Sequence, residues 1–290
     1  MTEAAYICLN GEFKKAAEPC LFPHNRAFRF GDVLHENLHA CATELQFPGY
    51  HLERLSENMR ALSMHMPAYF SVRMLTQLTA QLLNKNRIFG GAWVRLTVYR
   101  DPCEDSVADE GRISYIVESH RLEHDHYVLN DRGLAIDIST DFIKSVGSLS
   151  AIRSAHSLLY LLAGMEARKK NLDSSVLLNG AGRLVETPDS NIFLISGNAI
   201  FTPGIHQGCI PGIMRRVILE ISGEAGYRIN DQSSLTPAAL NDAEEVFLTN
   251  SIQGIQWVVA YRERRYYKRA ARILTEKLNE RAFGRESRSC

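Results

Sequence analysis

Several short stretches of the sequence carry residue types that could bind or transform a small ligand. Pro211-Gly212 opens a run with helical apolar periodicity. Proline fits the first turn of a helix, and glycine lets a ligand approach the backbone. The free N–H groups and positive dipole end of such a helix suit a phosphate group. A plain helix start is the alternative, since every helix has such an end.

Two predicted strands end in polar residues that could face a cleft. Glu186 closes one of them, just before the turn-forming residues 187–191. Thr249-Asn250-Ser251 closes another and offers three short polar groups. Ordinary turn chemistry is the alternative interpretation of both segments.

Histidines gather between the two halves of the chain. His120, His124 and His126 lie close to Glu123 and Asp125. A His-x-His pair on a strand could chelate a metal. The segment is polar and linker-like, with no fourth ligand in view, so we expect no metal site here.

The elements that must position these residues form two similar series. The first half predicts an Asn10-Gly11 hairpin, helices at about 51–65 and 71–86, and strands at 92–99 and 113–117. The second half predicts strands at about 134–139, 175–178, 183–186, 191–195, 199–202 and 245–249. Its helices are expected at about 154–170, 212–223 and 268–283.

Hairpins followed by single helices, twice over, favour an α+β chain of two lobes. We expect an N-terminal α+β lobe at 1–118, a linker at 119–126 and a C-terminal cofactor-binding lobe at 127–290. The cleft between the lobes is then the default binding site.

Composition limits the class of protein. The chain has 290 residues, 45% of them apolar, with 33 basic and 33 acidic residues and no net charge. This excludes disordered and collagenous chains and gives no electrostatic reason to expect nucleic acid. No apolar run approaches 18 residues, so we expect no membrane partner. The six cysteines are scattered, which fits a reducing compartment, and the first twenty residues lack the apolar core of a signal peptide. We therefore expect a cytoplasmic protein.

Taken together, five segments resemble the class IV aminotransferases, the pyridoxal-phosphate family of fold type IV. That family includes branched-chain and D-amino acid aminotransferases and aminodeoxychorismate lyases. The resemblance runs from Tyr6 to about Val259. It is carried by segments 28–36, 51–55 (His-Leu-Glu-Arg-Leu), 166–193, 210–215 (Ile-Pro-Gly-Ile-Met-Arg) and 247–251 (Phe-Leu-Thr-Asn-Ser).

The resemblance implies a fold and a set of residue roles. The expected fold has a small N-terminal α/β sandwich lobe and a larger, β-barrel-like C-terminal lobe with helices. Arg54 would bind the cofactor phosphate, because its guanidinium is always charged and can donate two parallel hydrogen bonds. Glu186 would pair with the pyridinium nitrogen. Further roles fall on Ile213, Met214, Asn250 and Ser251 toward the cofactor, and on Arg100, His35 and Arg95 toward the substrate.

One position departs from the family pattern. Counting back from the helical triplet Leu161-Leu162-Ala163 puts Arg153 where the family has its Schiff-base lysine. An imine needs a neutral amine, and a guanidinium does not deprotonate in proteins. Arg153 could instead hold a carboxylate or a ring oxygen as a bidentate partner.

Lys144 is the alternative. It lies nine residues upstream, about 30 Å away if the chain were extended. Ile143-Lys144-Ser145 matches the expected text only if residues 146–150 form an inserted loop.

These alternatives leave three functions open: cofactor-free chemistry in the same cleft by a relative that shares only the fold, and two that use a phosphorylated ligand. One of these two is an active class IV transaminase or lyase, with pyridoxal phosphate on Lys144 or with an unconventional mechanism. The other is an altered or inactive relative that binds pyridoxal phosphate, pyridoxamine phosphate or another phosphorylated ligand non-covalently at Arg153, as a binding or regulatory partner. In either case we expect a small amino acid or keto acid as ligand, and a homodimer.

Overall fold

The computed structural model describes residues 5–101 and 112–284, which fall into two compact units. Unit 1 runs to His126 and also contains Arg153–His156. Unit 2 contains Tyr127–Ile152 and the residues from Ser157 onward. The expected 119–126 linker ends where unit 1 ends, although residues 119–121 are the last part of a strand. Within the predicted second lobe, 127–290, Arg153–His156 group with unit 1, and Ser154 pairs with Leu34 of β3.

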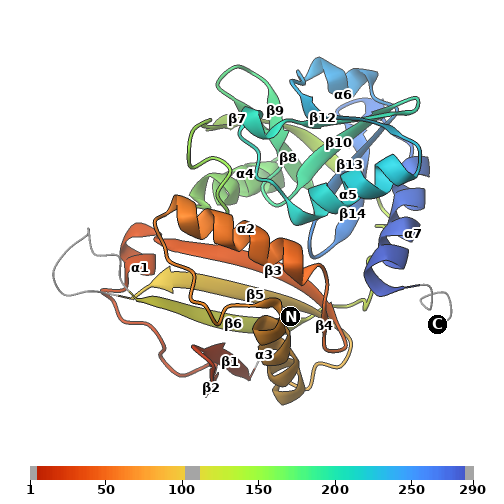
Figure 1. Ribbon diagram of the computed structural model, residues 1–290. Coiled ribbons are helices and arrows are strands. Elements are labelled where there is room, and N and C mark those ends of the chain that lie inside the picture. The colour runs from red at the N-terminus through yellow and green to blue at the C-terminus, as the bar shows by residue number, and fades with distance from the viewer. Residues whose placement is uncertain (1–4, 102–111, 285–290) are drawn as a thin grey trace. The chain divides into compact units, whose positions relative to one another are not determined.

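Unit 1 is built on a six-stranded antiparallel sheet with the strand order β2-β1-β6-β5-β3-β4 (Figure 1). Its elements are β1 (Tyr6–Leu9), β2 (Glu12–Lys15), α1 (Arg26–Phe30), β3 (Val33–Cys41), β4 (Glu44–Leu45), α2 (Pro48–Ala61), α3 (Val72–Lys85), β5 (Gly91–Arg100) and β6 (Ile113–Arg121). The Asn10-Gly11 hairpin is confirmed, with both residues at positive φ.

The two faces of this sheet differ in character. Glu36 of β3 points to α2, where its carboxylate meets His51 and Arg54. Ser119 of β6 bonds to Asn86 at the end of α3, so both helices cover that face. Because side chains alternate along a strand, the neighbouring residues lie on the opposite face. We call that surface the polar face, after its half-buried residues His35, Asn37, Trp93, Arg95 and Thr97.

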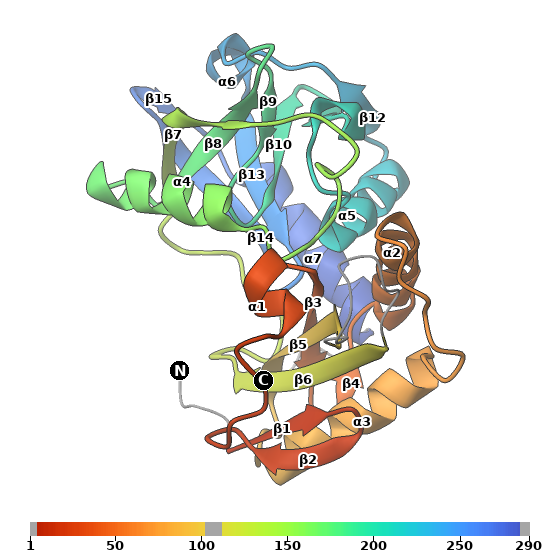
Figure 2. The same ribbon diagram turned by 90° about the vertical axis from the view of Figure 1, so that its left-hand side faces the viewer.

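Unit 2 is built on a nine-stranded sheet with helices around it (Figure 2). Its elements are β7 (Leu134–Lys144), α4 (Leu158–Lys169), β8 (Ser174–Asn179), β9 (Leu184–Glu186), β10 (Asn191–Ser196), β11 (Ala199–Pro203), η1 (Ile205–Gln207), α5 (Ile213–Glu224), β12 (Arg228–Ser233), α6 (Ala238–Asp242), β13 (Glu245–Asn250), β14 (Gly254–Tyr261), β15 (Arg264–Arg265) and α7 (Arg269–Phe283).

The sheet of unit 2 curls back on itself. Strand β9 ends the order β12-β11-β10-β13-β14-β7-β8-β9, yet it contacts β10 and β11 near the other end. The inside of the curl is apolar and includes Ile136, Val176, Leu184, Ile192 and Val246. Helices α5 and α7 pack outside, against β13 and its neighbours, and α4 packs on β7 and β8. The expected barrel-like second lobe is confirmed.

Apolar periodicity located most elements to within a few residues. Two differences lie close together: β7 runs five residues past the expected end at 139, to Lys144, and α4 begins at Leu158 and not at about 154. Residues before it form backbone bonds to β3: His35 N donates to Arg153 O, and Ala155 N donates to Val33 O, each at 3.1 Å. A segment held as a strand partner cannot also form the first turn of a helix. In the described ranges, no helix is long and apolar enough to cross a membrane.

Candidate active site

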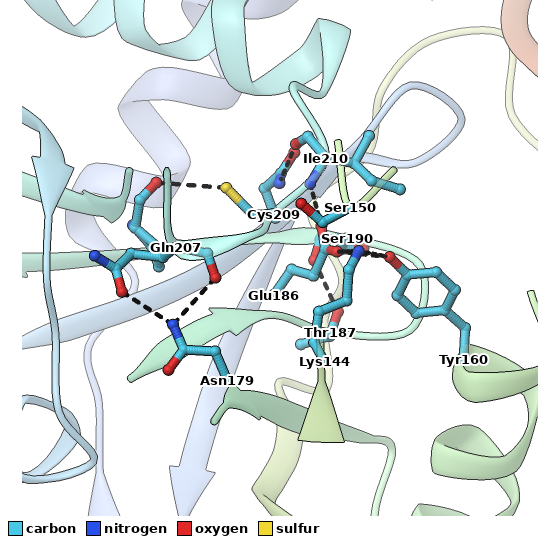
Figure 3. A network of polar contacts seen from close by, with 12 residues as sticks. Lys144, Ser150, Tyr160, Asn179, Glu186, Thr187, Ser190, Gln207, Cys209 and Ile210 are labelled. Atoms are coloured by element: carbon cyan, nitrogen blue, oxygen red, sulfur yellow. Dashed lines mark hydrogen bonds and ion pairs between the residues drawn. The ribbon is translucent and has the colours of Figure 1, made fainter. Parts of the chain in front are cut away.

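One buried polar cluster of unit 2 joins Lys144 to Glu186 (Figure 3). Lys144 Nζ lies 2.8 Å from Glu186 Oε1, and both side chains are buried, with 7% and 4% of their surfaces exposed. The hydroxyl of Tyr160 donates to the same oxygen at 2.7 Å and accepts from Lys144 Nζ. An amine, a phenol and a carboxylate therefore meet in one protected place.

Sheet register explains how residues 42 positions apart meet. Lys144 is the last residue of β7 and lies opposite Asn179 of the parallel strand β8. Glu186 is the last residue of β9, which pairs with β8 on its other side at Leu177. Both side chains thus project from neighbouring ends of strands that flank β8. Long side chains bridge the two intervening strand spacings, about 10 Å in all.

Tyr160 reaches the cluster from the first turn of α4. Residues 145–157 fold back between β7 and α4, with a turn at residues 148–151. The extended-chain distance that argued against Lys144 as a partner of this helix therefore does not apply. Arg153, in the same connection, belongs to unit 1.

The second carboxylate oxygen of Glu186 faces the approach to α5. Glu186 Oε2 accepts from the backbone N–H of Ile210 at 2.9 Å. Gly212 then caps α5 and, having no side chain, leaves its first N–H groups without a side-chain acceptor. A Cβ on Gly212 would lie 2.1 Å from Asn191 Oδ1, so only glycine fits. Ile213 and Met214, which the sequence singled out, are the first two residues of this helix.

Strand β13 adds hydroxyl and amide groups beside this helix start. Thr249 lies opposite Asn191 in the sheet, and its buried Oγ1 has no hydrogen-bond partner among the described residues. Asn250 is committed to its own turn, since its Oδ1 accepts from the N–H groups of Ile252 and Gln253. Ser251 is half-buried, and its carbonyl accepts from the Tyr127 hydroxyl at 3.3 Å.

Cys209 lies beside this cluster but is unsuited to nucleophilic chemistry. Its thiol is 1% exposed, and Sγ lies 3.6 Å from the carbonyl oxygens of Pro203 and Gly204. Burial, together with the negative charge of Glu186, raises the pKa of Cys209 to about 12. The thiolate that a nucleophile requires is therefore scarce at neutral pH.

Arg54, the predicted phosphate ligand, lies in unit 1 within a buried ion pair. Its Nε and Nη2 donate to Glu36 at 3.0 and 2.6 Å, and His51 Nδ1 lies 2.6 Å from the same carboxylate. Burial acts to raise the pKa of Glu36, but Arg54 and the hydrogen bond from His51 outweigh it and hold the pKa at about 2. Glu36 therefore stays charged and fixes the guanidinium plane. The phosphate role of Arg54 remains a prediction.

The three predicted substrate residues have different surroundings in unit 1. Arg100 is engaged already, since its guanidinium is 3.7 Å from Asp32 and donates to the carbonyl of Leu62. His35 and Arg95 lie on the polar face, where His35 Nδ1 is 3.0 Å from Thr97 Oγ1. Arg153 joins these two through its pairing with β3.

Sequence reasoning did not single out three of the side chains in these clusters, Glu36, His51 and Tyr160. Glu36 and His51 lay inside motifs that were noticed, yet their pairing with Arg54 depends on β3 packing against α2. Tyr160 gave no signal by spacing, because only the folded connection brings it to Lys144. Within the described residues, His, Cys, Asp and Glu form no group that could hold a metal ion.

Comparison with known proteins identifies the architecture. The family model for "Amino-transferase class IV" matches residues 42–261, most of the chain. The chain belongs to the class IV aminotransferase family.

Members of this family with different names resemble the chain to a similar degree. A Methanocaldococcus jannaschii protein named "Putative branched-chain-amino-acid aminotransferase" is 24% identical over 277 residues, covering 95% of this chain and 94% of its own. The aminodeoxychorismate lyase of Vibrio harveyi is 23% identical over 233 residues, with 80% and 83% covered. The fold matches the branched-chain amino acid aminotransferase of Thermobaculum terrenum in its PLP form, with a TM-score of 0.84 at 18% identity over 99% and 96% of the two chains.

Proposed function

We propose that this protein is a pyridoxal-phosphate-dependent enzyme that acts on the amino group of a small amino acid or keto acid. Lys144 is the residue that would hold the cofactor, through its ε-amine. The supporting observation is the buried Lys144–Glu186–Tyr160 cluster in the unit that carries α5. Lys144 can supply a neutral amine, which Arg153 cannot.

The donor set of unit 2 fits the cofactor. A carboxylate suits a pyridine nitrogen, and Glu186 supplies one that is held by an N–H group of the backbone. A helix start without a side-chain cap suits a phosphate group, and the start of α5 is of this kind. Asn191 packs closely against its first residue, Gly212. The unpartnered hydroxyl of Thr249 is a further donor beside it. When bound, pyridoxal phosphate supplies an electron sink for the carbon that carries the amino group.

The residues of this chain would divide the remaining work. Glu186 would keep the ring nitrogen protonated, and Ile213 and Met214 would hold the phosphate through backbone N–H groups. The Lys144 amine would carry a proton to and from the substrate carbon, and the Tyr160 hydroxyl would accept a hydrogen bond from its ammonium form. Arg54 and Ser251 are proposed as additional phosphate ligands, by resemblance to the family.

The reaction proposed first is transamination, with a lyase reaction on a chorismate-derived acid as its alternative. Relatives named for either reaction are about equally similar to the chain. The two share the amine and the electron sink and differ in which bond at the substrate is broken.

A homodimer is part of the proposal. Leu158, Leu161 and Met165 of α4 are 66%, 61% and 44% exposed, and their spacing puts them on one face of the helix. An exposed apolar stripe of this kind is typical of a protein interface. We also propose a cytoplasmic location, which the scattered free cysteines favour.

The test of the function combines cofactor binding with turnover. Titrating the protein with pyridoxal phosphate should produce an absorption band distinct from that of free cofactor, and a panel of amino acid donors should then yield oxo acid. Lys144→Ala should abolish oxo acid formation, whereas the matched control Lys169→Ala in α4 should not. Equal turnover by both variants would contradict the role of Lys144.

A further inference from the structure

Strand β7 contains a large bulge between two regular parts, and this bulge determines the direction in which Lys144 points. Ile138 lies opposite Val176 of the parallel strand β8, and Ile143 lies opposite Leu178. Five steps along β7 therefore match two steps along β8, which leaves three extra residues in the bulge. The backbone groups of such extra residues have no partners in the ladder of the sheet and need other ones.

An odd number of extra residues moves the following residues to the other face of the sheet, because side chains alternate along a strand. Before the bulge, Asp137 lies opposite Ser175, whose hydroxyl donates to the carbonyl of Ala163 in α4. Odd-numbered residues there thus face α4. After the bulge, Lys144 lies opposite Asn179, which shares its face of β8 with Ser175. Lys144 therefore faces α4 as well. In an unbroken strand it would face the apolar interior of unit 2.

The carboxylate of Glu166 supplies partners for the bulge from α4, which packs on β7 and β8 (Figure 2). Its Oε1 accepts from the backbone N–H of Thr140 at 3.0 Å and from the Thr140 hydroxyl at 2.8 Å. Its Oε2 accepts from the Ser139 hydroxyl at 2.6 Å. One side chain of the helix thus binds two consecutive residues of the bulge.

Glu166 is both buried and charged. Its side chain is 8% exposed, and Lys170, one helical turn further along α4, donates to its carboxylate. Burial acts to raise the pKa of Glu166, but the hydrogen bonds from Lys170, Ser139 and Thr140 outweigh it and hold the pKa at about 2. Hydrogen bonds to an ionised acceptor are stronger than those between neutral groups. Loss of this carboxylate would also leave the buried Ser139 hydroxyl without its acceptor.

We propose that Glu166 is a positioning residue: it holds the bulge of β7 in the form that turns Lys144 toward α4 and Glu186. Helix α4 then contacts β7 at two points. Tyr160 binds Lys144 from the first turn of the helix. Glu166, about 9 Å further along at 1.5 Å per residue, binds the bulge four residues before Lys144. Glu166 acts on the amine through the backbone of β7.

This inference deepens the proposed function and rests on it in one respect: it takes Lys144 as the residue that holds the cofactor. The placement of Lys144 is measured first in the cofactor-free protein, through the reactivity of its amine. Acetic anhydride modifies exposed amines, and peptide mass mapping gives the rate at each lysine. In the unmodified protein Lys144, with 7% of its side chain exposed, should react slowly compared with Lys14, with 39% exposed.

The variant Glu166→Ala should release the bulge and expose this amine. Acetylation of Lys144 should become at least about tenfold faster, as expected for the loss of one charge-assisted hydrogen bond, while that of Lys14 stays unchanged. In the enzyme loaded with pyridoxal phosphate, kcat should fall by at least about tenfold with little change in KM, because misplacing a reacting group by about 1 Å impairs the chemical step.

A conservative variant gives a second measurement. Glu166→Gln keeps an oxygen that can accept from the Thr140 N–H group, so its acetylation rate and kcat should lie between those of the unmodified protein and Glu166→Ala. If circular dichroism shows that Glu166→Ala is unfolded, Glu166→Gln carries the test. Its Lys144 should then still react several-fold faster than in the unmodified protein, and an unchanged rate would overturn the proposal.

The matched control is Ser175→Ala, which removes the 3.1 Å hydrogen bond from β8 to Ala163 of α4 and leaves the bulge intact. It should lower stability in urea and leave the acetylation of Lys144 and kcat unchanged. A folded Glu166→Ala protein with unchanged acetylation of Lys144 would overturn the positioning role. An equal increase in Ser175→Ala would overturn it too, because general loosening of α4 would then explain both results.

Borohydride reduction of the same proteins, loaded with pyridoxal phosphate, separates the two proposals. An adduct on Lys144 of the unmodified protein, with equal acetylation rates in Glu166→Ala, would overturn the positioning role alone. The absence of an adduct on Lys144 in the unmodified protein, with faster acetylation in Glu166→Ala, would overturn the proposed function. The placement of Lys144 by Glu166 would then still stand.

Discussion

Replacing only Glu186 of the buried Lys144–Glu186 ion pair should lower the stability of the protein strongly, whereas replacing both residues should not. In Glu186→Gln, the ammonium of Lys144 would remain buried with neutral partners only. Breaking a buried ion pair in this way costs about 3–5 kcal/mol. In a unit of this size that corresponds to a fall in Tm of roughly 10 °C.

The opposite single change should cost less. Lys144→Met leaves the Glu186 carboxylate with two donors, the Tyr160 hydroxyl and the Ile210 N–H group. Hydrogen bonds to a charged group retain much of its stabilisation, so we expect a loss of about 1 kcal/mol. The double change Lys144→Met with Glu186→Gln removes both charges and should restore or exceed the original stability.

Urea unfolding of the four cofactor-free proteins, followed by circular dichroism, measures these differences as a double-mutant cycle. The expected order of stability is double variant, at or above the unmodified protein, then Lys144→Met, then Glu186→Gln. A double variant less stable than either single variant would refute the reasoning, because the pair would then be structural and not retained for chemistry.

Three further predictions concern other parts of the molecule. Acid should destabilise unit 1 in two steps, because folding lowers the pKa of both His35 and Glu36. A group whose pKa is lowered by folding stabilises the native state fully only above its unfolded-state pKa. The contribution of His35 is therefore lost as the pH falls from about 6.5 to 4, and that of Glu36 as the pH falls toward 2. Glu36→Gln should remove the lower step from a pH series of urea melts. Gly212→Ala should weaken pyridoxal phosphate binding and lower stability by about 1–3 kcal/mol, because its Cβ meets Asn191. The control is Gly223→Ala in the same helix, where a Cβ would meet no atom within 4 Å. It should leave stability unchanged or raise it by up to about 1 kcal/mol. Equal losses of stability for the two glycine variants in urea melts would contradict this prediction. Leu161→Asp should reduce the mass in light scattering by half if α4 forms the dimer interface, and an unchanged mass would exclude that face.

Local patterns were sufficient for most of the fold. Apolar alternation and helical spacing located the hairpin at Asn10-Gly11, the long helices and the paired strands, since each pattern reflects burial of one face. The repeated order of hairpins and single helices predicted two lobes. The resemblance of five ordered segments added the barrel-like form of the second lobe.

Spacing along the sequence does not show which side chains meet near α4. Counting from the helix considered only the length of the connection before Leu158, whereas the folded connection brings Lys144 to Tyr160. Arg153 lies in this connection and is bound to β3 by backbone hydrogen bonds that are independent of side-chain identity. Backbone hydrogen bonds of this kind cannot be predicted from residue types, and neither can the contact between Tyr160 and Lys144.

The identity of the residue that holds the cofactor is the central claim, and borohydride reduction tests it most directly. The protein would be loaded with pyridoxal phosphate, reduced, digested and mapped by peptide mass. The account predicts a single modified peptide that contains Lys144, and its loss in Lys144→Ala. Bound cofactor with no reducible adduct, or an adduct on another lysine, would contradict it.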